Sequence, residues 1–389
     1  MANKISIAIV GGGVVGCAVA WELSRRFDGI FLFEKNLGIT RGENQSSRNS
    51  GVIHSGIYYD RETRPLKASL CVMGNRLLYD FCDRYKVPAL NTGKLLIANS
   101  RDEEAVLDFY LDRARQNQVP GVKRISGSRV KELEPNITAK SALIAPSTGI
   151  VDPTALVYRL NSLASQKGVQ FMIGTEVVGL EVFGGCFILH IRYPDGKSDQ
   201  VRSRVVINAA GIDADLLARL LNHGSTYQLD PMRGESYKFY CHKRPELKLR
   251  GMNIYPTPEY VTTQNGCHFT VGIHLTPTFK EVFYPPTLGS TITVGPKLVP
   301  VDNRREWQGI SVPARVFADK IRPFFPDIKE GDLSWHQAGL QARLKGTSDF
   351  VIMPDPAQSN FINLLGIDSP GLTSCLAIAR RVGEILNAE

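Results

Sequence analysis

The sequence lacks the patterns that identify many hydrolases, metalloproteins and membrane proteins. Its seven cysteines are scattered and never spaced as C-x-x-C, so neither a disulfide framework nor a zinc site is expected. It has no P-loop, no G-x-S-x-G turn and no H-E-x-x-H helix, which excludes the NTPase, serine hydrolase and zinc protease classes that carry them. No run approaches the ~18 consecutive apolar residues of a membrane-spanning helix. We expect no metal ion and no integral membrane segment.

The charge balance indicates which classes of binding partner to expect. Lys and Arg outnumber Asp and Glu by 46 to 38, giving a net charge of +8, yet no run of five basic residues occurs. This surplus fits an anionic substrate or a membrane surface, and its dispersion predicts no nucleic-acid binding. Scattered cysteines fit a reducing compartment, and an apolar segment from Ile5 onward leaves no room for a targeting peptide. We expect a cytoplasmic protein. Peripheral contact with the inner membrane and the oligomeric state are both left open.

The chain is long for a single core. At 389 residues, with 35 Gly and 22 Pro, it exceeds the roughly 100–200 residues of an ordinary domain. Two domains or one large α/β assembly are therefore expected.

The first residues contain a nucleotide-binding motif. Ile5–Val10 reads I-S-I-A-I-V, which is typical of a buried parallel strand. Gly11, Gly13 and Gly16 follow as G-x-G-x-x-G: the first permits a tight turn, the second lets a pyrophosphate approach, and the third lets helix and strand pack closely. The helix N-terminus attracts the phosphates. A second apolar run ends in Glu34, which can bind both hydroxyls of an adenosine ribose. The motif alone does not separate NAD from FAD.

The polar loop that follows carries a family resemblance. Residues 44–59 read N-Q-S-S-R-N-S-G-V-I-H-S-G-I-Y-Y. This stretch resembles the D-amino-acid-oxidase-like superfamily of FAD-dependent oxidoreductases, and most of all its L-2-hydroxyglutarate dehydrogenase branch. T-G-K-L-L-I-A at 92–98, T-G-I-V-D-P at 148–153 and I-N-A-A-G at 207–211 extend the resemblance, which covers roughly residues 5–387. It implies FAD as the cofactor.

The resemblance also implies the architecture. It is α/β (α+β): a Rossmann-like FAD-binding domain with a parallel sheet, and a mostly antiparallel substrate-binding domain, both discontinuous in sequence. We assign residues 1–90, 150–225 and 339–389 to the first domain, and residues 91–149 and 226–338 to the second. Alternating runs in 226–338 predict an antiparallel sheet with helices on one face.

Shorter patterns predict individual elements. We expect strands at 92–98, 170–173, 205–211 and 361–365, and helices at 154–167 and 374–386. Asp152 is a plausible N-cap for the first of these helices.

Glycine motif and resemblance together place FAD in contact with a defined set of residues. The loop around residues 46–52 surrounds the flavin and its phosphates, Val177 lies near the adenine, and the loop 366–373 with the following helix N-terminus faces the flavin ring, where the helix dipole stabilises negative charge. The expected contacts are Gly11, Gly13, Val14, Val15, Gly16, Glu34, Lys35, Ser46, Ser47, Asn49, Ser50, Gly51, Val52, Val177, Ala210, Gly211, Gly371, Leu372 and Thr373.

Two histidines are candidates for accepting the substrate's proton. His54 comes first, because a neutral imidazole suits proton transfer near pH 7 and the resemblance brings this loop to the flavin. The alternative is a structural histidine that holds the cofactor loop. His274, in G-I-H-L-T-P, is the second candidate, or else a hydrogen-bonded residue of a sheet.

Arginine and tyrosine complete the expected catalytic set. Arg233 and Arg343 are candidates for binding substrate carboxylates, because the planar guanidinium group binds a carboxylate through two hydrogen bonds. Each can instead form an ion pair at the surface or at the interface between domains. Tyr59 either closes the site or packs in the core.

The family reaction implies FAD-dependent oxidation of a small anionic 2-hydroxy acid, with L-2-hydroxyglutarate and its oxidation to 2-oxoglutarate preferred. Oxygen, a quinone or a flavoprotein is the expected electron acceptor. Two departures keep alternatives open. Residues 366–373 read G-I-D-S-P-G-L-T, which is similar to FAD-linked glycerol-3-phosphate dehydrogenases and oxidases, and residues 256–268 resemble an insertion. Glycerol 3-phosphate, an amino acid, or a purely structural FAD in a binding protein remain alternatives.

Overall fold

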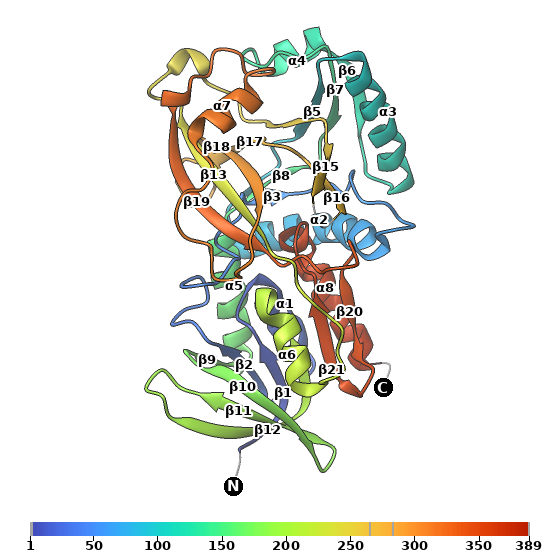
Figure 1. Ribbon diagram of the computed structural model, residues 1–389, viewed down its shortest axis with the longest axis vertical. Coiled ribbons are helices and arrows are strands. Elements are labelled where there is room, and N and C mark those ends of the chain that lie inside the picture. The colour runs from blue at the N-terminus through green and yellow to red at the C-terminus, as the bar shows by residue number, and fades with distance from the viewer. Residues whose placement is uncertain (1–2, 264–265, 282–283, 388–389) are drawn as a thin grey trace.

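Two β-sheets stand at opposite ends of the long axis of the molecule (Figure 1). The computed structural model describes residues 3–263, 266–281 and 284–387. Helix α2 (Pro65–Tyr85) and the start of α8 (Gly371–Asn387) lie between the two sheets. The mixed α/β fold with a parallel and a mostly antiparallel sheet is therefore confirmed.

The first sheet, at the bottom of Figure 1, has a parallel core. Its parallel strands are, in spatial order, β9 (Gln170–Ile173), β2 (Ile30–Glu34), β1 (Asn3–Val10), β12 (Ser198–Asn208) and β21 (Gln358–Leu365). Antiparallel strands extend it: β11 (Cys186–Arg192) pairs with β12, β10 (Glu176–Phe183) pairs with β11, and β20 (Val351–Asp355) pairs with β21. The apolar runs of the parallel strands suit a sheet that is covered on both faces.

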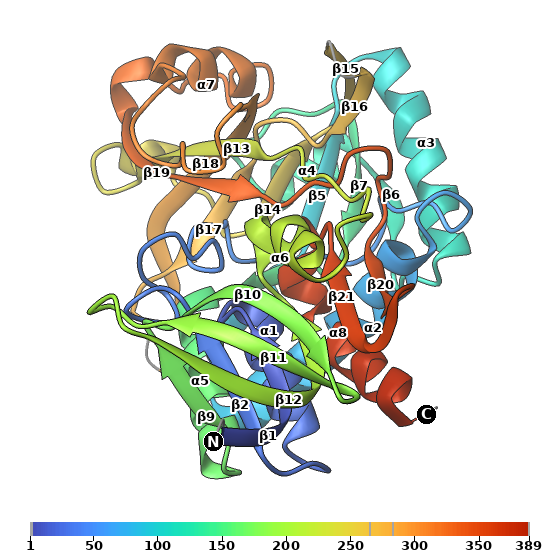
Figure 2. The ribbon, with the colours of Figure 1, turned by 60° about the horizontal axis from the view of Figure 1, so that its bottom comes forward.

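Alternating side chains of β1 join two cores, because successive residues of a strand point to opposite faces. Ile7 and Ile9 pack in one core with α1 (Val14–Leu23), α5 (Pro153–Gln166) and α8. Ala8 and Val10 pack in another core with β10, β11 and α6 (Ala214–Leu221). Figure 2 shows α6 and the β10–β11 hairpin in front of this sheet. The parallel sheet is thus the middle layer of three.

The second sheet is mostly antiparallel. Its strands are, in spatial order, β19 (Leu333–Gln341), β13 (Met232–Tyr240), β18 (Leu288–Pro300), β17 (Leu275–Phe279), β14 (Asn253–Pro256), β5 (Lys94–Ala98), β7 (Ser141–Ala145) and β6 (Lys123–Ser126). Among the described pairs, β14 and β5 run parallel and the others antiparallel.

Helices cover both faces of this second sheet, which corrects the expectation of helices on one face. Leu95 and Ile97 of β5 pack with α4 (Gly127–Leu133) and α7 (Ala314–Ile321). Leu96 and Ala98 pack with α3 (Arg101–Gln116) on the opposite face. The segment 91–149 supplies α3, so the composition of 226–338 could not indicate this second layer.

Short elements connect the sheets. The strands β3 (Val52–Ile53), β8 (Gly149–Val151) and β4 (Ala89–Leu90) form a small sheet of their own. Single 3-10 turns are η1 (Gly211–Asp213), η2 (Pro245–Leu247) and η3 (Glu330–Asp332). The expected insertion at 256–268 contains most of the hairpin β15 (Glu259–Thr263) and β16 (Gly266–Thr270), and its residues 264–265 lie outside the described residues.

The expected local elements are confirmed with small shifts. Helix α8 begins at Gly371, three residues before the expected start, and β12 ends at Asn208, before the small-residue turn. The side chain of Asp152 accepts a hydrogen bond from the backbone N–H of Ala155 at 2.7 Å, as expected of an N-cap. The proposed domain boundaries at 90/91 and 225/226 fall between elements, whereas those at 149/150 and 338/339 fall inside β8 and β19.

Candidate functional site

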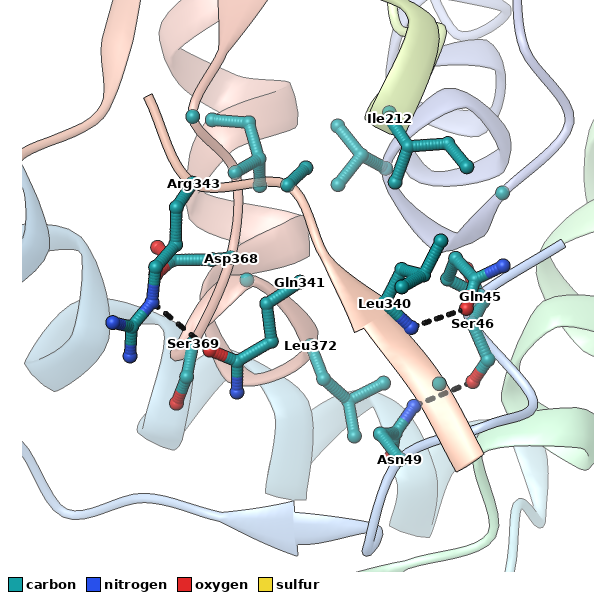
Figure 3. A pocket seen from close by; sticks show the side chains of 18 of the residues that line it. Gln45, Ser46, Asn49, Ile212, Leu340, Gln341, Arg343, Asp368, Ser369 and Leu372 are labelled. Carbon is teal, nitrogen blue, oxygen red and sulfur yellow. Dashed lines mark hydrogen bonds and ion pairs between the residues drawn. The ribbon is translucent and has the colours of Figure 1, made fainter. Parts of the chain in front are cut away.

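A cavity of about 1140 Å³ lies between the two sheets, and residues of both line its wall. Its volume slightly exceeds the roughly 300–1,000 Å³ of ordinary small-molecule sites. In Figure 3, Arg343, Asp368, Ser369 and Gln341 gather on one side of β19, and Gln45 and Ser46 of the loop 44–52 lie on the other. We call these the substrate end and the cofactor end of the cavity.

The glycine turn joins β1 to α1 at the cofactor end. Gly11 has a φ of +110°, and a Cβ there would lie 2.2 Å from the carbonyl oxygen of Ala209, so glycine is required. A Cβ on Gly13 would lie 3.1 Å from the hydroxyl oxygen of Ser46, and the Val14 N–H donates to that hydroxyl at 2.8 Å. Helix α1 has no acidic residue in its first turn. Its N-terminus therefore offers an anion site that a side chain would obstruct.

Glu34 ends β2 beside this turn. Its carboxylate accepts hydrogen bonds from the N–H of Gly12 at 2.8 Å and of Asn36 at 2.7 Å, and the residue is buried. It lines the cavity together with Lys35, whose ammonium is 2.5 Å from a carboxylate oxygen of Glu43. Glu34 is thus held in place by backbone N–H groups, with carboxylate lone pairs to spare for further donors.

Most of the expected FAD contacts line the cavity, and four lie just behind it. Those on the wall are Gly11, Gly13, Val14, Val15, Glu34, Lys35, Ser46, Asn49, Ser50, Val52, Val177, Ala210, Gly211, Gly371 and Leu372. Behind the wall, Gly16 packs against the carbonyl of Gly11, and the Ser47 hydroxyl donates to the carbonyl of Thr40. Gly51 adopts a φ of +69°, and the Thr373 hydroxyl accepts from the N–H of His54 at 3.0 Å. These four shape the wall and do not line it.

His54 follows β3 at the substrate end. Its backbone is held at both ends, because its carbonyl also accepts from the Asn75 side chain at 3.0 Å. Its ring Nε2 lies 3.4 Å from the hydroxyl oxygen of Ser369. Burial, together with the charges of Lys94 and His274, holds the pKa of His54 well below its usual value. The imidazole is therefore neutral at pH 7 and able to accept a proton.

His274 also lines the cavity, but its ring is constrained. It stacks on Tyr255 with ring centroids 3.8 Å apart, and its Nδ1 lies 3.1 Å from the carbonyl oxygen of Gly272. Because a carbonyl only accepts, Nδ1 carries the proton. Burial lowers the pKa of His274 to about 3. This histidine is neutral as well, and its stacked ring is oriented by Tyr255.

Arg343 lines the substrate end within a charged group that the sequence did not reveal. Its Nε donates to the Gln341 side chain at 3.2 Å and lies 3.7 Å from a carboxylate oxygen of Asp368 (Figure 3). The other carboxylate oxygen of Asp368 lies 2.5 Å from the ammonium of Lys67. Lys67 and Asp368 are 301 residues apart, so no spacing in the sequence indicates that they meet. Two cations around one carboxylate leave this end able to bind an anion.

Arg233 is the one expected carboxylate ligand that the structure turns away from the cavity. On β13, Gly234 and Ser236 line the cavity, so the intervening side chains point to the other face. There Arg233 pairs with buried Glu235 at 3.1 Å. The expectation for Arg233 is corrected: it is an internal ion pair, and strand alternation is the reason.

Tyr59 remains at the substrate end. It is buried, lines the cavity and hydrogen-bonds the Ser369 side chain, and burial raises the pKa of its hydroxyl well above the usual value. The hydroxyl of Ser369 thus contacts both Tyr59 and His54. Tyr59 orients that hydroxyl and stays protonated.

Two negative findings concern the part of the chain that the structure describes. No helix there is both long and apolar enough to cross a membrane. No group of three or more His, Cys, Asp or Glu side chains there is arranged to hold a metal ion.

The donor set at the cofactor end fits FAD. The glycine turn and the helix N-terminus suit a pyrophosphate, Glu34 suits a ribose, and Ser46, Asn49 and Ser50 supply polar contacts along the wall. The second helix N-terminus at the cavity is that of α8, which has no acidic residue in its first turn. Both helix ends favour negative charge in the cavity.

Comparison with known families agrees with this geometry. The family described as DAO, FAD dependent oxidoreductase, matches residues 6–385 of the chain. The chain belongs to this family: it is an FAD-dependent oxidoreductase, and FAD is its cofactor.

Named relatives fall into two groups. A mitochondrial L-2-hydroxyglutarate dehydrogenase of Arabidopsis thaliana is 29% identical, with 98% of this chain and 83% of the relative covered. A glycerol 3-phosphate dehydrogenase of Caloramator mitchellensis is also 29% identical, with 98% and 73% covered. Among solved structures, the FAD-bound L-α-glycerophosphate oxidase of Mycoplasma pneumoniae has a TM-score of 0.85 and 25% identity, with 99% and 95% covered. The family resemblance expected from the sequence is confirmed.

Proposed function

We propose that this enzyme oxidises a small anionic 2-hydroxy acid, with L-2-hydroxyglutarate as the preferred substrate and 2-oxoglutarate as the product. One observation carries the proposal: the neutral imidazole of His54 lies at the same end of one cavity as Arg343 and Lys67. A base beside a surplus of positive charge is what a hydroxy acid requires, since its hydroxyl loses a proton while its carboxylates stay charged.

Different residues bind the substrate, accept its proton and orient the base. The guanidinium of Arg343 binds a carboxylate and orients the carbon that bears the hydroxyl group. Nε2 of His54 accepts the hydroxyl proton, and the Ser369 hydroxyl, which Tyr59 also contacts, orients the imidazole. FAD supplies the acceptor for the hydride, with its two electrons, that leaves the same carbon. The hydroxyl oxygen becomes the carbonyl oxygen of the product.

Glycerol 3-phosphate is the second candidate, because it is also an anionic alcohol. The closing loop at 366–373 reads G-I-D-S-P-G-L-T, and the glycerol 3-phosphate dehydrogenase and the glycerophosphate oxidase named above support this alternative. The hydroxyglutarate dehydrogenase relative supports the first candidate.

Anaerobic bleaching of the FAD absorbance separates the candidates. We expect L-2-hydroxyglutarate to bleach the flavin, and D-2-hydroxyglutarate, glycerol 3-phosphate and amino acids to leave it oxidised. Bleaching by glycerol 3-phosphate without a response to L-2-hydroxyglutarate would make glycerol 3-phosphate the proposed substrate. If no candidate bleaches the flavin, a structural FAD in a binding protein is the better proposal.

We further propose a separate electron acceptor, whether oxygen, a quinone or a flavoprotein, and a location in the cytoplasm. The dispersed net charge of +8 supports an anionic substrate or a peripheral contact with a membrane, and we propose no nucleic-acid partner. Reoxidation of the reduced flavin by each acceptor in turn tests this choice.

A further inference from the structure

Lys94 is a buried lysine whose ammonium has no structural partner in the described part of the chain to explain it. It is the first residue of β5, only 1% exposed, and its ammonium has no hydrogen-bond partner among the described residues. It shares its face of the strand with Leu96 and Ala98, which pack in an apolar core. Burying an ammonium without a partner is costly, so a structural role alone would favour an apolar residue here.

Two aromatic rings separate Lys94 from the cavity. Its Nζ lies 3.8 Å from the ring centroid of Tyr255 and 4.7 Å from that of Tyr58, distances typical of cation–π contacts. Both tyrosines line the cavity, and Tyr255 stacks on His274. The ammonium therefore lies one ring behind the wall of the substrate end.

The groups that face Lys94 come from four other elements. They are His54 and Tyr58 after β3, Cys71 of α2, Tyr255 of β14, and His274 before β17. None of these is a carboxylate, so no fixed negative charge in this group neutralises the ammonium. A negative charge that enters the cavity would therefore act on a positive charge that these groups leave unneutralised.

We propose that Lys94 is a positioning residue whose side-chain amine, held behind Tyr58 and Tyr255, takes up a proton when a substrate anion binds, and that the resulting positive charge keeps His54 and His274 neutral. The inference rests on the proposed function, because it needs an anionic substrate in the cavity.

Charge balance explains both effects. Burial lowers the pKa of Lys94 to about 7, so near neutral pH its charge depends on what lies nearby. An anion within reach favours the protonated amine, and binding then draws a proton from the buffer. Below about pH 7 the same positive charge disfavours a second one, and it contributes to lowering the pKa of His54 and His274. Both histidines stay ready to accept a proton.

Proton uptake on binding tests the inference without catalysis. Glutarate, which has no hydroxyl to oxidise, is titrated into the FAD-loaded enzyme at pH 8 by calorimetry in two buffers of different ionisation enthalpy. We expect the wild type to take up about half a proton or more per bound glutarate. Lys94→Met, which keeps the length of the stem, should bind glutarate more weakly and take up none. Leu96→Val, on the same face of β5, should keep the wild-type uptake.

A second measurement, with a second variant, keeps the inference testable if Lys94→Met does not fold. The pH profile of flavin reduction by L-2-hydroxyglutarate should rise at higher pH in Lys94→Met, or in Lys94→Gln, than in the wild type, because His54 loses a neighbouring positive charge. Glutarate binding without proton uptake in the wild type overturns the inference, as does unchanged uptake in a folded Lys94 variant. Failure of glutarate to bind the wild type overturns the proposed diacid site itself.

Discussion

The cofactor end and the substrate end of the cavity recognise their ligands by different means. The cofactor end relies mostly on local features: the glycine turn and helix N-terminus at 11–16, the carboxylate of Glu34 beside that turn, and the loop 44–52. The substrate end uses side chains that come from five separate parts of the chain: the loop after β3, α2, the loop before β17, β19 with the residues that follow it, and the loop at 366–373. Residues close together in the sequence determine the cofactor end, whereas the substrate end depends on how distant elements pack.

The two histidines at the substrate end show a similar contrast. His54 has its Nε2 directed to the hydroxyl of Ser369, a residue of the cavity wall. His274 has its ring stacked on Tyr255 and its Nδ1 proton engaged by a backbone carbonyl. This difference favours His54 as the proton acceptor, and the largest predicted effect follows from it.

His54→Ala should have the largest effect, slowing flavin reduction without releasing FAD. We expect FAD to stay bound, because the cofactor end holds it, and the rate of flavin reduction to fall by roughly 10²–10⁴. The wild-type rate should rise with pH below about 6.5, where this base loses its proton, and the variant should lose that limb. Stopped-flow reduction at several pH values measures both. His190→Ala, at a half-buried histidine of β11 that does not line the cavity, is the control. Loss of flavin with an unchanged rate after reloading would move the base to His274.

Arg343→Ala should weaken substrate binding and leave the cofactor end intact. Losing a charged hydrogen bond to a carboxylate costs about 1.5–3 kcal/mol, or roughly 10–150-fold in the dissociation constant. Titration with glutarate, followed by the flavin spectrum, measures it. Arg381→Ala, which breaks a surface pair with Glu384, should change nothing. Equal affinity in Arg343→Ala and the wild type would remove Arg343 from the substrate site.

Glu34→Ala should do the reverse, weakening FAD while sparing the substrate. We expect a loss of about 1–3 kcal/mol in FAD binding, because a charge-assisted hydrogen bond disappears together with the bonds to Gly12 and Asn36. Equilibrium dialysis of FAD from the apoprotein gives the constant. Glu62→Ala, at an exposed carboxylate outside the glycine turn, is the control. An FAD affinity equal to that of the wild type would contradict the role of Glu34.

His274→Phe should leave both ends of the cavity in place and act on acid stability alone. The folded pKa of about 3 lies below the usual value near 6.5, so the unfolded chain binds the extra proton between these values and stability falls as the pH drops. Between pH 7 and pH 5 this histidine should remove about 2 kcal/mol of unfolding free energy. Phenylalanine keeps the stack on Tyr255 and cannot titrate, so the variant should lose less stability on acidification. Urea unfolding at both pH values measures the difference, and equal losses would contradict the burial of His274.

The sequence by itself determined the cofactor end. Strand β1, the turn at 11–16 and the acidic end of β2 follow from contiguous residues, because apolar runs, glycine conformations and helix N-termini are local properties. The same holds for the Asp152 cap and for the family to which the chain belongs.

Only the tertiary structure decided the substrate end. Arg233 and Arg343 look alike in the sequence, yet the alternation of β13 turns the first to a buried ion pair, and the second lies at the cavity wall. Lys67 meets Asp368 across 301 residues, and Lys94 reaches the back of the wall because β5 pairs with β14 beside Tyr255. A side chain's partners depend on strand register and on which elements pack together, and these are long-range properties that local patterns do not contain.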